Sequence, residues 1–196
     1  MRADGRKTRR GVTPRGFGVL LKCIYCYAMT AMTPEAARTL PSPLGPFRIE
    51  VCSDGLTHCG WIVSDWADTD AMARTQSPVG TLRPLLEQAE QQFHAYFAGQ
   101  LQHFDLPLAP GGTPFQQQVW QQLRGVAYGH TKSYGDIAKA VGRATAARAV
   151  GAAVGRNPLA IIVPCHRIVG ANGALTGFAS GLDRKRWLLA LETARD

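Results

Sequence analysis

The most constraining feature of this chain is a short apolar segment, residues 159–163, that stops at a proline. The segment is rich in β-branched side chains and is bounded by Pro158 and Pro164, which is typical of a buried strand. The chain then passes directly to Cys165 and His166. Because a nearby histidine or positive charge lowers the pKa of a thiol, this order predicts a nucleophilic cysteine at the end of a buried strand. The plainer interpretation is that Cys165 is only a small buried apolar residue, as many free cysteines are.

Charge is distributed unevenly along the 196 residues. The formal net charge of +8 divides into +6 for residues 1–40, −5 for residues 41–112 and +7 for residues 113–196. A basic C-terminal part beside an acidic middle favours contact of that part with a polyanion such as nucleic acid. The chain has no apolar run of about 18 residues, so no membrane contact is expected.

The cysteines argue for a reducing environment. There are five, an odd number, and they are dispersed along the chain, which does not fit a disulfide framework. Cys23 and Cys26 form a lone C-x-x-C pair with no second pair nearby, a weak signal for zinc. We therefore expect no metal, no cofactor and a cytoplasmic location, associated with the nucleoid if the protein is bacterial.

Three segments are expected from composition and periodicity. Residues 1–40 are basic and lack helix caps or clear periodicity, so a disordered tail is predicted, with Met29 or Met32 as the possible true start. Residues 41–111 carry two strand patterns, 47–51 and 56–63, and an amphipathic helix pattern over 82–97, which predict an α/β domain. Residues 112–196 form the third segment, mainly helical in pattern.

The third segment contains a pattern typical of a helix-turn-helix. Thr113 and Ser133 have the features of helix N-caps, and helices are predicted from 113 to 125, 133 to 142 and 145 to 155. The third of these is lean and alanine-rich, with Arg148 as its one long cation, so it could press against a minor groove only ~6 Å wide; packing of the alanines in a core is the alternative. A last helix, 184–194, should be capped by Asp183. It carries Glu192 in its last turn. An acid there opposes the helix dipole, a mild cost that pairing with a residue such as His166 would explain.

The sequence Pro164-Cys165-His166-Arg167, preceded by Asn157-Pro158, resembles the signature of the methylated-DNA–protein-cysteine methyltransferases, the O6-alkylguanine-DNA alkyltransferases. The resemblance covers roughly residues 42–196. It implies a ribonuclease H-like α/β domain followed by a mainly α, helix-turn-helix (winged-helix-like) DNA-binding domain. Further matching segments are Phe115-Gln116-Gln117, Val119-Trp120, Ser133-Tyr134-Gly135, Arg148-Ala149-Val150-Gly151 and Trp187-Leu188-Leu189.

The resemblance also implies the chemistry. A monomer would bind duplex DNA, flip an O6-alkylated guanine or an O4-alkylated thymine out of the stack and take the alkyl group onto Cys165 in a single turnover. His166 would accept the thiol proton through water, and Glu192 would orient His166. Tyr134 would rotate the nucleotide by pressing on its phosphate, and Asn157 would order the backbone beside the thiol.

The remaining implied residues contact DNA or the flipped base. Arg148 would fill the gap left in the stack. The other DNA-binding residues would be Tyr134, Ala149, Gly151 and Lys185, and the base pocket would be formed by Cys165, Ile168, Ala179 and Ser180.

Two other functions fit parts of the pattern. A Cys-His-Glu hydrolase with an incidental helix-turn-helix would turn over repeatedly. A DNA-binding regulator without chemistry would resemble the alkyltransferase-like proteins, but these lack the nucleophilic cysteine that this chain has at position 165.

Overall fold

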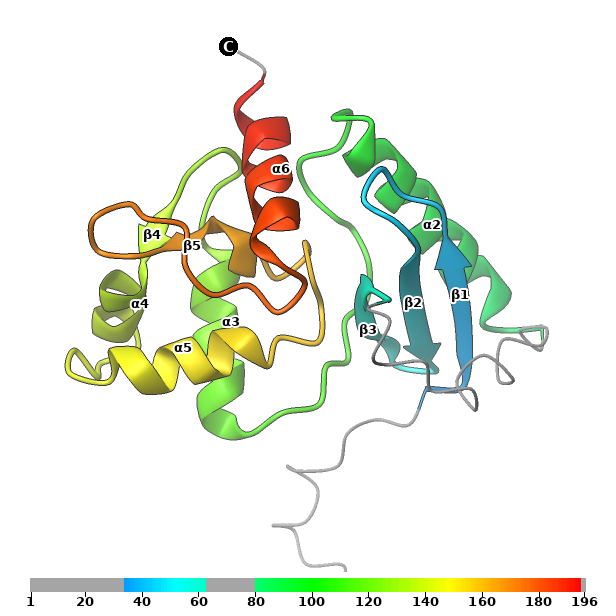
Figure 1. The fold of residues 1–196 in the computed structure, drawn as a ribbon. Coiled ribbons are helices and arrows are strands. Elements are labelled where there is room, and N and C mark those ends of the chain that lie inside the picture. Colours follow the sequence, from blue (N-terminus) through cyan, green and yellow to red (C-terminus); the bar gives the residue numbers. More distant parts are fainter. Residues whose placement is uncertain (1–33, 63–79, 195–196) are drawn as a thin grey trace, which may run out of the picture.

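The computed structural model describes residues 34–62 and 80–194, which form two domains side by side (Figure 1). The N-terminal domain is an antiparallel three-stranded sheet in the order β1-β2-β3, with helix α2 packed against β1 and β2. Its elements are β1 (Ala36–Leu40), β2 (Phe47–Cys52), β3 (Gly55–Trp61) and α2 (Arg83–Phe97).

Alternation of apolar and polar residues explains the sheet. Phe47, Ile49 and Val51 of β2 are buried and pack toward α2. The ring of Phe47 lies 4.8 Å from that of Phe93 in α2, measured between centroids. The predicted strands at 47–51 and 56–63 and the predicted helix at 82–97 are therefore confirmed, with shifts of a few residues at their ends.

Strand β1 corrects the predicted extent of the N-terminal tail. Residues Ala36–Leu40 pair with β2 in the register Ala36↔Val51 to Leu40↔Phe47, so the disordered tail predicted for all of residues 1–40 is wrong for this segment. The strand is short and begins with two alanines, so its local pattern is weak, and pairing with β2 stabilises it. Residues 1–33, which include the C-x-x-C pair and both candidate start methionines, lie outside the described residues.

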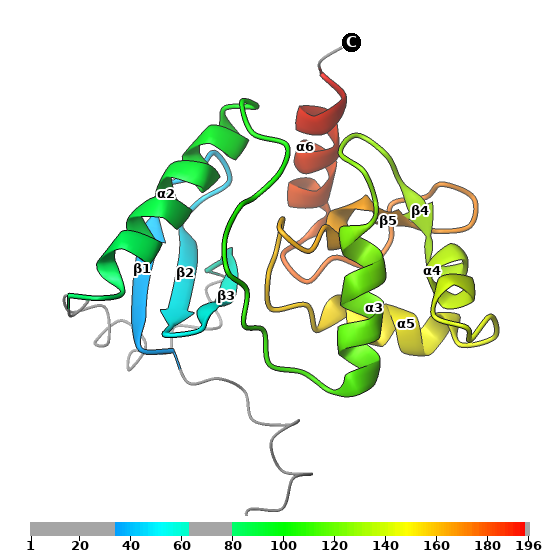
Figure 2. The ribbon, with the colours of Figure 1, turned by 180° about the vertical axis from the view of Figure 1, so that it is seen from behind.

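The C-terminal domain is mainly helical. Helices α3, α4 and α5 pack on one another, and a short parallel pair, β4 and β5, lies beside α6 (Figure 2). Its elements are α3 (Pro114–Arg124), β4 (Lys132–Ser133), α4 (Tyr134–Ala140), α5 (Ala147–Gly155), the 3₁₀ turn η3 (Cys165–Arg167), β5 (Ile168–Val169) and α6 (Leu182–Thr193).

Local capping signals fix the starts of two of these helices. The Thr113 and Ser133 side chains each accept a hydrogen bond from the backbone N–H three residues on, in complete capping boxes, as predicted. The predicted cap at Asp183 is wrong. Helix α6 begins at Leu182 with Gly181 at its N-cap and no side-chain cap, and the Asp183 carboxylate instead accepts a hydrogen bond from Arg186.

Residues 159–163 are buried as predicted, apart from half-buried Ile162, but they do not form a strand. They make a tight turn in which Val163 N–H donates to the Leu159 carbonyl at 2.9 Å, with Ile161 at the positive φ of 74°. A positive φ is strained for a β-branched residue, so tertiary contacts hold it. Apolarity predicted the burial of this segment, whereas its path is set by the neighbouring domain.

The neighbouring domain contributes the edge of β3. Cys59 N–H donates to the Pro158 carbonyl at 2.8 Å, and Ala160 N–H donates to the Cys59 carbonyl at 2.9 Å. The segment that leads to Cys165 is thereby anchored on the N-terminal sheet. Among the helices of residues 34–62 and 80–194, none is long and apolar enough to cross a membrane.

Candidate active site

Cys165 lies at the start of η3, directly after the tight turn, and is 8% exposed. Asn157 ties its sulfur to the turn. The Asn157 amide nitrogen donates to Cys165 Sγ at 3.2 Å and to the Val163 carbonyl at 2.8 Å, while its oxygen accepts from Leu159 N–H at 2.9 Å. The predicted role of Asn157 in ordering the backbone beside the thiol thus has direct contacts to support it.

Burial raises the pKa of the Cys165 thiol, and the hydrogen bond from Asn157 together with the charge of Lys185 acts in the opposite direction. Desolvation disfavours the charged form, so the resting sulfur is a thiol. A base is therefore needed to generate the thiolate.

His166 is the adjacent base and is completely buried. Its Nε2 lies 2.8 Å from Glu192 Oε1. Burial acts to raise the pKa of Glu192, but hydrogen bonds from His166 and Arg167, together with the charge of Arg167, hold it well below its ordinary range. An ionised carboxylate only accepts hydrogen bonds, so Nε2 of His166 carries the hydrogen.

The other ring nitrogen of His166 is consequently the basic one. Nδ1 is buried and has no hydrogen-bond partner among the described residues. Burial lowers the pKa of His166, against the opposing effect of Glu192, which keeps the imidazole neutral and able to accept a proton. The predicted pairing of His166 with Glu192 is present, and it leaves Nδ1 without a hydrogen-bond partner among the described residues.

Glu192 has two further side-chain partners that the sequence analysis missed. Arg167 donates from Nε to Oε2 and from Nη2 to Oε1, both at 2.8 Å, and from Nη1 to the Val126 carbonyl at 2.6 Å. Tyr96 of α2 donates its hydroxyl to Oε1 at 2.7 Å. A tyrosine on the buried face of an amphipathic helix needs a partner for its hydroxyl, but the sequence does not say which.

Tyr134 and Lys185 anchor the loop that follows β5. The Tyr134 hydroxyl donates to the carbonyls of Thr176 at 3.2 Å and Gly177 at 3.3 Å. Lys185 Nζ donates to the carbonyl of Ile168 and, at 2.7 Å, to that of Thr176. Because the Lys185 side chain is fully buried, its predicted role as a DNA contact is wrong; it supports the loop.

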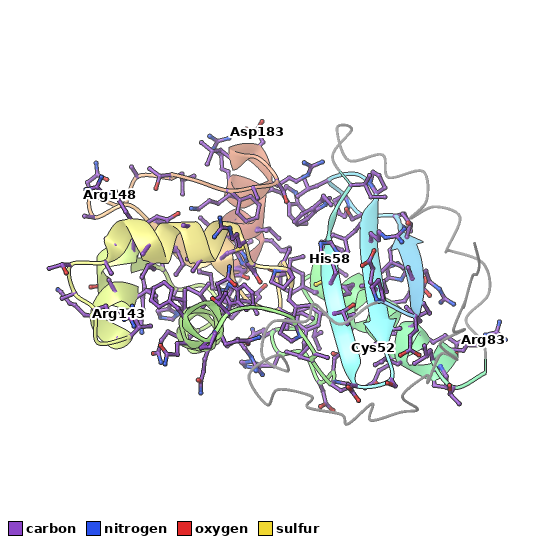
Figure 3. All side chains as sticks on the ribbon, turned by 90° about the horizontal axis from the view of Figure 1, so that it is seen from below. Cys52, His58, Arg83, Arg143, Arg148 and Asp183 are labelled. Atoms are coloured by element: carbon purple, nitrogen blue, oxygen red, sulfur yellow. The ribbon has the colours of Figure 1, made fainter. Side chains whose placement is uncertain are left out.

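The other predicted DNA-contacting residues lie on α5. Arg148 and Ala149 are exposed and Gly151 is half-buried. Arg148 projects from the domain on the side away from the N-terminal sheet (Figure 3). The Tyr134 ring lies next to α5, since a Cβ built on Gly151 would be 3.9 Å from two of its carbons. Ala179 is exposed and Ser180 is half-buried in the loop that Lys185 supports.

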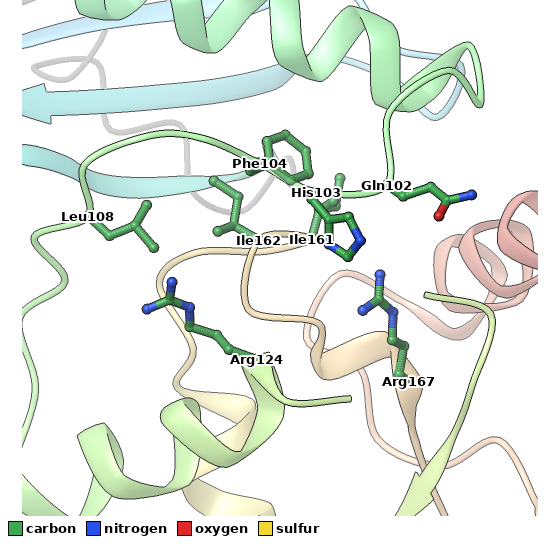
Figure 4. A pocket seen from close by; sticks show the side chains of 8 residues that line it. All are labelled: Gln102, His103, Phe104, Leu108, Arg124, Ile161, Ile162 and Arg167. Carbon is green, nitrogen blue, oxygen red and sulfur yellow. The ribbon is translucent and has the colours of Figure 1, made fainter. Parts of the chain in front are cut away.

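A separate hollow of about 140 Å³ lies between the domains (Figure 4). One wall belongs to the linker between α2 and α3, and the other contains Arg124, Arg167 and the tight turn at Ile161 and Ile162. Cys165 does not line it, so it is not the predicted base pocket. Within the described ranges, no group of three or more His, Cys, Asp or Glu side chains is placed to hold a metal ion.

A buried thiol held by an amide, beside a histidine whose tautomer is fixed by a carboxylate, is typical of proteins that pair a cysteine nucleophile with a histidine base. The chain's similarity to known proteins defines it further. The model described as 6-O-methylguanine DNA methyltransferase, ribonuclease-like domain, matches residues 37–110, and that described as the DNA binding domain of the same family matches residues 114–194. The chain belongs to the 6-O-methylguanine DNA methyltransferase family.

Individual relatives agree with this assignment. The methylated-DNA–protein-cysteine methyltransferase of Methanosarcina acetivorans is 45% identical, over 77% of this chain and 94% of the relative. The constitutive enzyme of Bacillus subtilis is 46% identical, over 79% and 93%. The crystal structure of Mycobacterium tuberculosis O6-methylguanine methyltransferase matches with a TM-score of 0.72 and 44% identity, covering 82% of this chain and 94% of that one. A structure of Mycobacterium tuberculosis OGT in complex with DNA matches with a TM-score of 0.71 and 45% identity, over the same shares.

Proposed function

We propose that this protein repairs DNA by moving an alkyl group from O6 of guanine to its own Cys165, once per molecule. The observation that carries the proposal is the contact of Cys165 with Asn157 next to a His166–Glu192 pair. The similarity to methylated-DNA–protein-cysteine methyltransferases over most of the chain identifies the substrate class.

The proposed reaction is a displacement at the alkyl carbon. The thiol proton moves through a water molecule to His166 Nδ1, leaving imidazolium stabilised by Glu192. The sulfur then forms a bond to the alkyl carbon while the carbon–O6 bond breaks, and the electron pair of that bond stays on the guanine. The Tyr134 hydroxyl turns from the Thr176 and Gly177 carbonyls and donates a hydrogen bond to the departing base, which stabilises the electron pair left on it. The product is a thioether, which thiol exchange does not cleave, so the protein acts once.

DNA binding is assigned to a helix-turn-helix formed by α4 and α5. The exposed face of α5 is narrow at Ala149 and Gly151, which suits close approach to a minor groove. Arg148 on this face would fill the place of the extruded nucleotide. Flipping is required because the reacting oxygen is otherwise inside the duplex. The protein would act as a monomer on duplex DNA that contains the lesion.

The flipped guanine would lie between Cys165 and the loop carrying Ala179 and Ser180. The carbonyl of Cys165 accepts a hydrogen bond from the Ile168 N–H, and the carbonyl of Ile168 accepts one from Lys185 Nζ. Each carbonyl oxygen has a second lone pair, which could accept the guanine amine. Lys185 would thereby orient one of these carbonyls.

Mass spectrometry tests this function. Incubation with an oligonucleotide duplex containing O6-methylguanine should add one methyl group to the Cys165 peptide, with a plateau at one equivalent under excess substrate. Continued product release would favour the hydrolase, and DNA binding without a mass gain would favour the regulator. Cys165→Ala should keep DNA binding and lose transfer; transfer at a comparable rate by this variant would refute the assignment of the acceptor.

A further inference from the structure

We infer that Tyr96 of the N-terminal domain is a positioning residue for the histidine base, because its hydroxyl holds the carboxylate that holds His166. The inference rests on the proposed function. It links the N-terminal domain to the chemistry through Glu192 and His166, since α2 belongs to that domain whereas Cys165, His166 and Glu192 belong to the other.

The geometry places three donors on one oxygen. Glu192 Oε1 faces Tyr96 Oη at 2.7 Å, His166 Nε2 at 2.8 Å and Arg167 Nη2 at 2.8 Å. The other oxygen, Oε2, accepts from Arg167 Nε at 2.8 Å and from Gly129 N–H at 3.2 Å. A carboxylate has about four lone-pair sites, so these five donors fill it. Oε1 is the more crowded of the two oxygens and is the one that His166 uses.

Tyr96 is suited to act only as a donor. Its side chain is completely buried. Burial, followed by the charge of Glu192 and the hydrogen bond to it, raises the pKa of the phenol far above its ordinary value. The hydroxyl therefore stays protonated and keeps donating to Oε1 throughout the working pH range.

The Tyr96 hydroxyl affects the pKa of His166 as well as the position of its ring. Donors that share an acceptor each weaken the bonds of the others, so Tyr96 limits how strongly Oε1 stabilises imidazolium. Without the hydroxyl, Glu192 would favour the charged form of His166, and Nδ1 would already carry a proton at a higher pH. A protonated Nδ1 cannot accept the thiol proton of Cys165. Other groups also face the His166–Glu192 pair, and all of them remain in a Tyr96 variant. They are Arg167 of η3, Tyr128 and the Gly129 N–H after α3, Lys185 of α6 and Cys165.

Tyr96→Phe in the full chain isolates the hydroxyl. The phenyl ring keeps its packing on Phe97 and Phe104, at 5.9 and 5.5 Å between centroids. The rate of methyl transfer in a single turnover should be measured against pH, together with the proton resonance of His166 Nε2–H in ¹⁵N-labelled protein. We expect the acid limb of the rate profile to move up by about half a pH unit, a loss of about threefold on that limb, and the resonance to move downfield as the bond to Oε1 strengthens.

The control is Phe93→Leu, one turn earlier on the same buried face of α2. Phe93 is fully buried and its side chain has no donor for a hydrogen bond to Glu192, so this variant should lower the melting temperature without moving the acid limb. A limb that does not move in Tyr96→Phe, or that moves equally in both variants, overturns the inference, as does an unmoved Nε2–H resonance. A moved resonance in a protein that transfers no alkyl group would overturn the proposed function while supporting the coupling of Tyr96 to His166.

Discussion

Replacing Glu192 with glutamine should destabilise the fold as well as the chemistry. Glu192 is 4% exposed and is paired with buried Arg167 through two hydrogen bonds. Glutamine has nearly the same shape but carries no charge, and its NH₂ group would face the donors that now surround the carboxylate. The guanidinium would be left buried without its counter-charge. Breaking a buried pair in this way costs about 3–5 kcal/mol in free energy of unfolding.

This magnitude can be measured by urea unfolding and by thermal melting. A loss of about 1 kcal/mol lowers the melting temperature of a chain of this size by about 2–4 °C, so Glu192→Gln should melt about 6–20 °C below the parent protein. Methyl transfer should fall at the same time, because His166 loses the group that fixes its tautomer.

The matched control makes the same chemical change at an exposed ion pair. Arg83 and Glu87 lie 3.2 Å apart, and their side chains are 67% and 50% exposed. Glu87→Gln should change stability by less than about 1 kcal/mol, as is usual for surface pairs. The reasoning about the buried pair would be refuted if the free energy of unfolding of Glu192→Gln lay within about 1 kcal/mol of that of the parent protein. It would also be refuted if Glu192→Gln melted no lower than Glu87→Gln.

Three further predictions concern the thiol, DNA and pH. Asn157→Ala removes a hydrogen bond that lowers the pKa of Cys165. Because hydrogen bonds to charged groups contribute about 1.5–3 kcal/mol, carbamidomethylation of Cys165 by iodoacetamide should slow about 10- to 150-fold near neutral pH, and an unchanged pH profile of that reaction would contradict this. Arg148→Ala removes an exposed side chain, so stability should stay within about 0.5 kcal/mol, while repair of duplex DNA falls more than reaction with free O6-methylguanine; equal losses on both substrates would exclude the stack-filling role. The folded-state pKa of Glu192 is lowered. The stability that its ionisation contributes is therefore complete above the ordinary carboxyl pKa of about 4.3 and is lost as the pH falls below that value. Between pH 7 and pH 3.5, the free energy of unfolding should consequently drop less in Glu192→Gln than in the parent protein.

Local signals in the sequence predicted much of this fold. The capping boxes at Thr113 and Ser133 and the spacing of apolar residues in α2 act within a few residues, so they can be read directly from the chain. The candidate site was also largely predictable, because Cys165 and His166 are adjacent and Asn157 lies close by in the sequence. An acid in the last turn of a helix opposes the helix dipole, which drew attention to Glu192, and the family resemblance implied its pairing with His166.

The missed features depend on contacts between distant segments. Tyr96 lies 96 residues from Glu192, and no periodicity indicates that pairing. Lys185 lies between two arginines in α6, which suggests an exposed face. Its ammonium is nevertheless buried, because the carbonyls of Ile168 in β5 and of Thr176 in the following loop accept its hydrogen bonds. The turn at Ile161 has a conformation that its own residue type disfavours, and the edge of β3 supplies the contacts that maintain it.

The burial of Cys165 affects how long an unused molecule survives. Peroxides and adventitious electrophiles react with the thiolate, and the raised pKa of this thiol keeps that form scarce until substrate arrives. For an ordinary enzyme, slow oxidation lowers a rate that the surviving molecules still sustain. A protein that is consumed in its reaction cannot compensate in this way, because each oxidised molecule leaves one lesion without an acceptor for its alkyl group. Keeping the sulfur protonated at rest therefore preserves the cell's stock of acceptors.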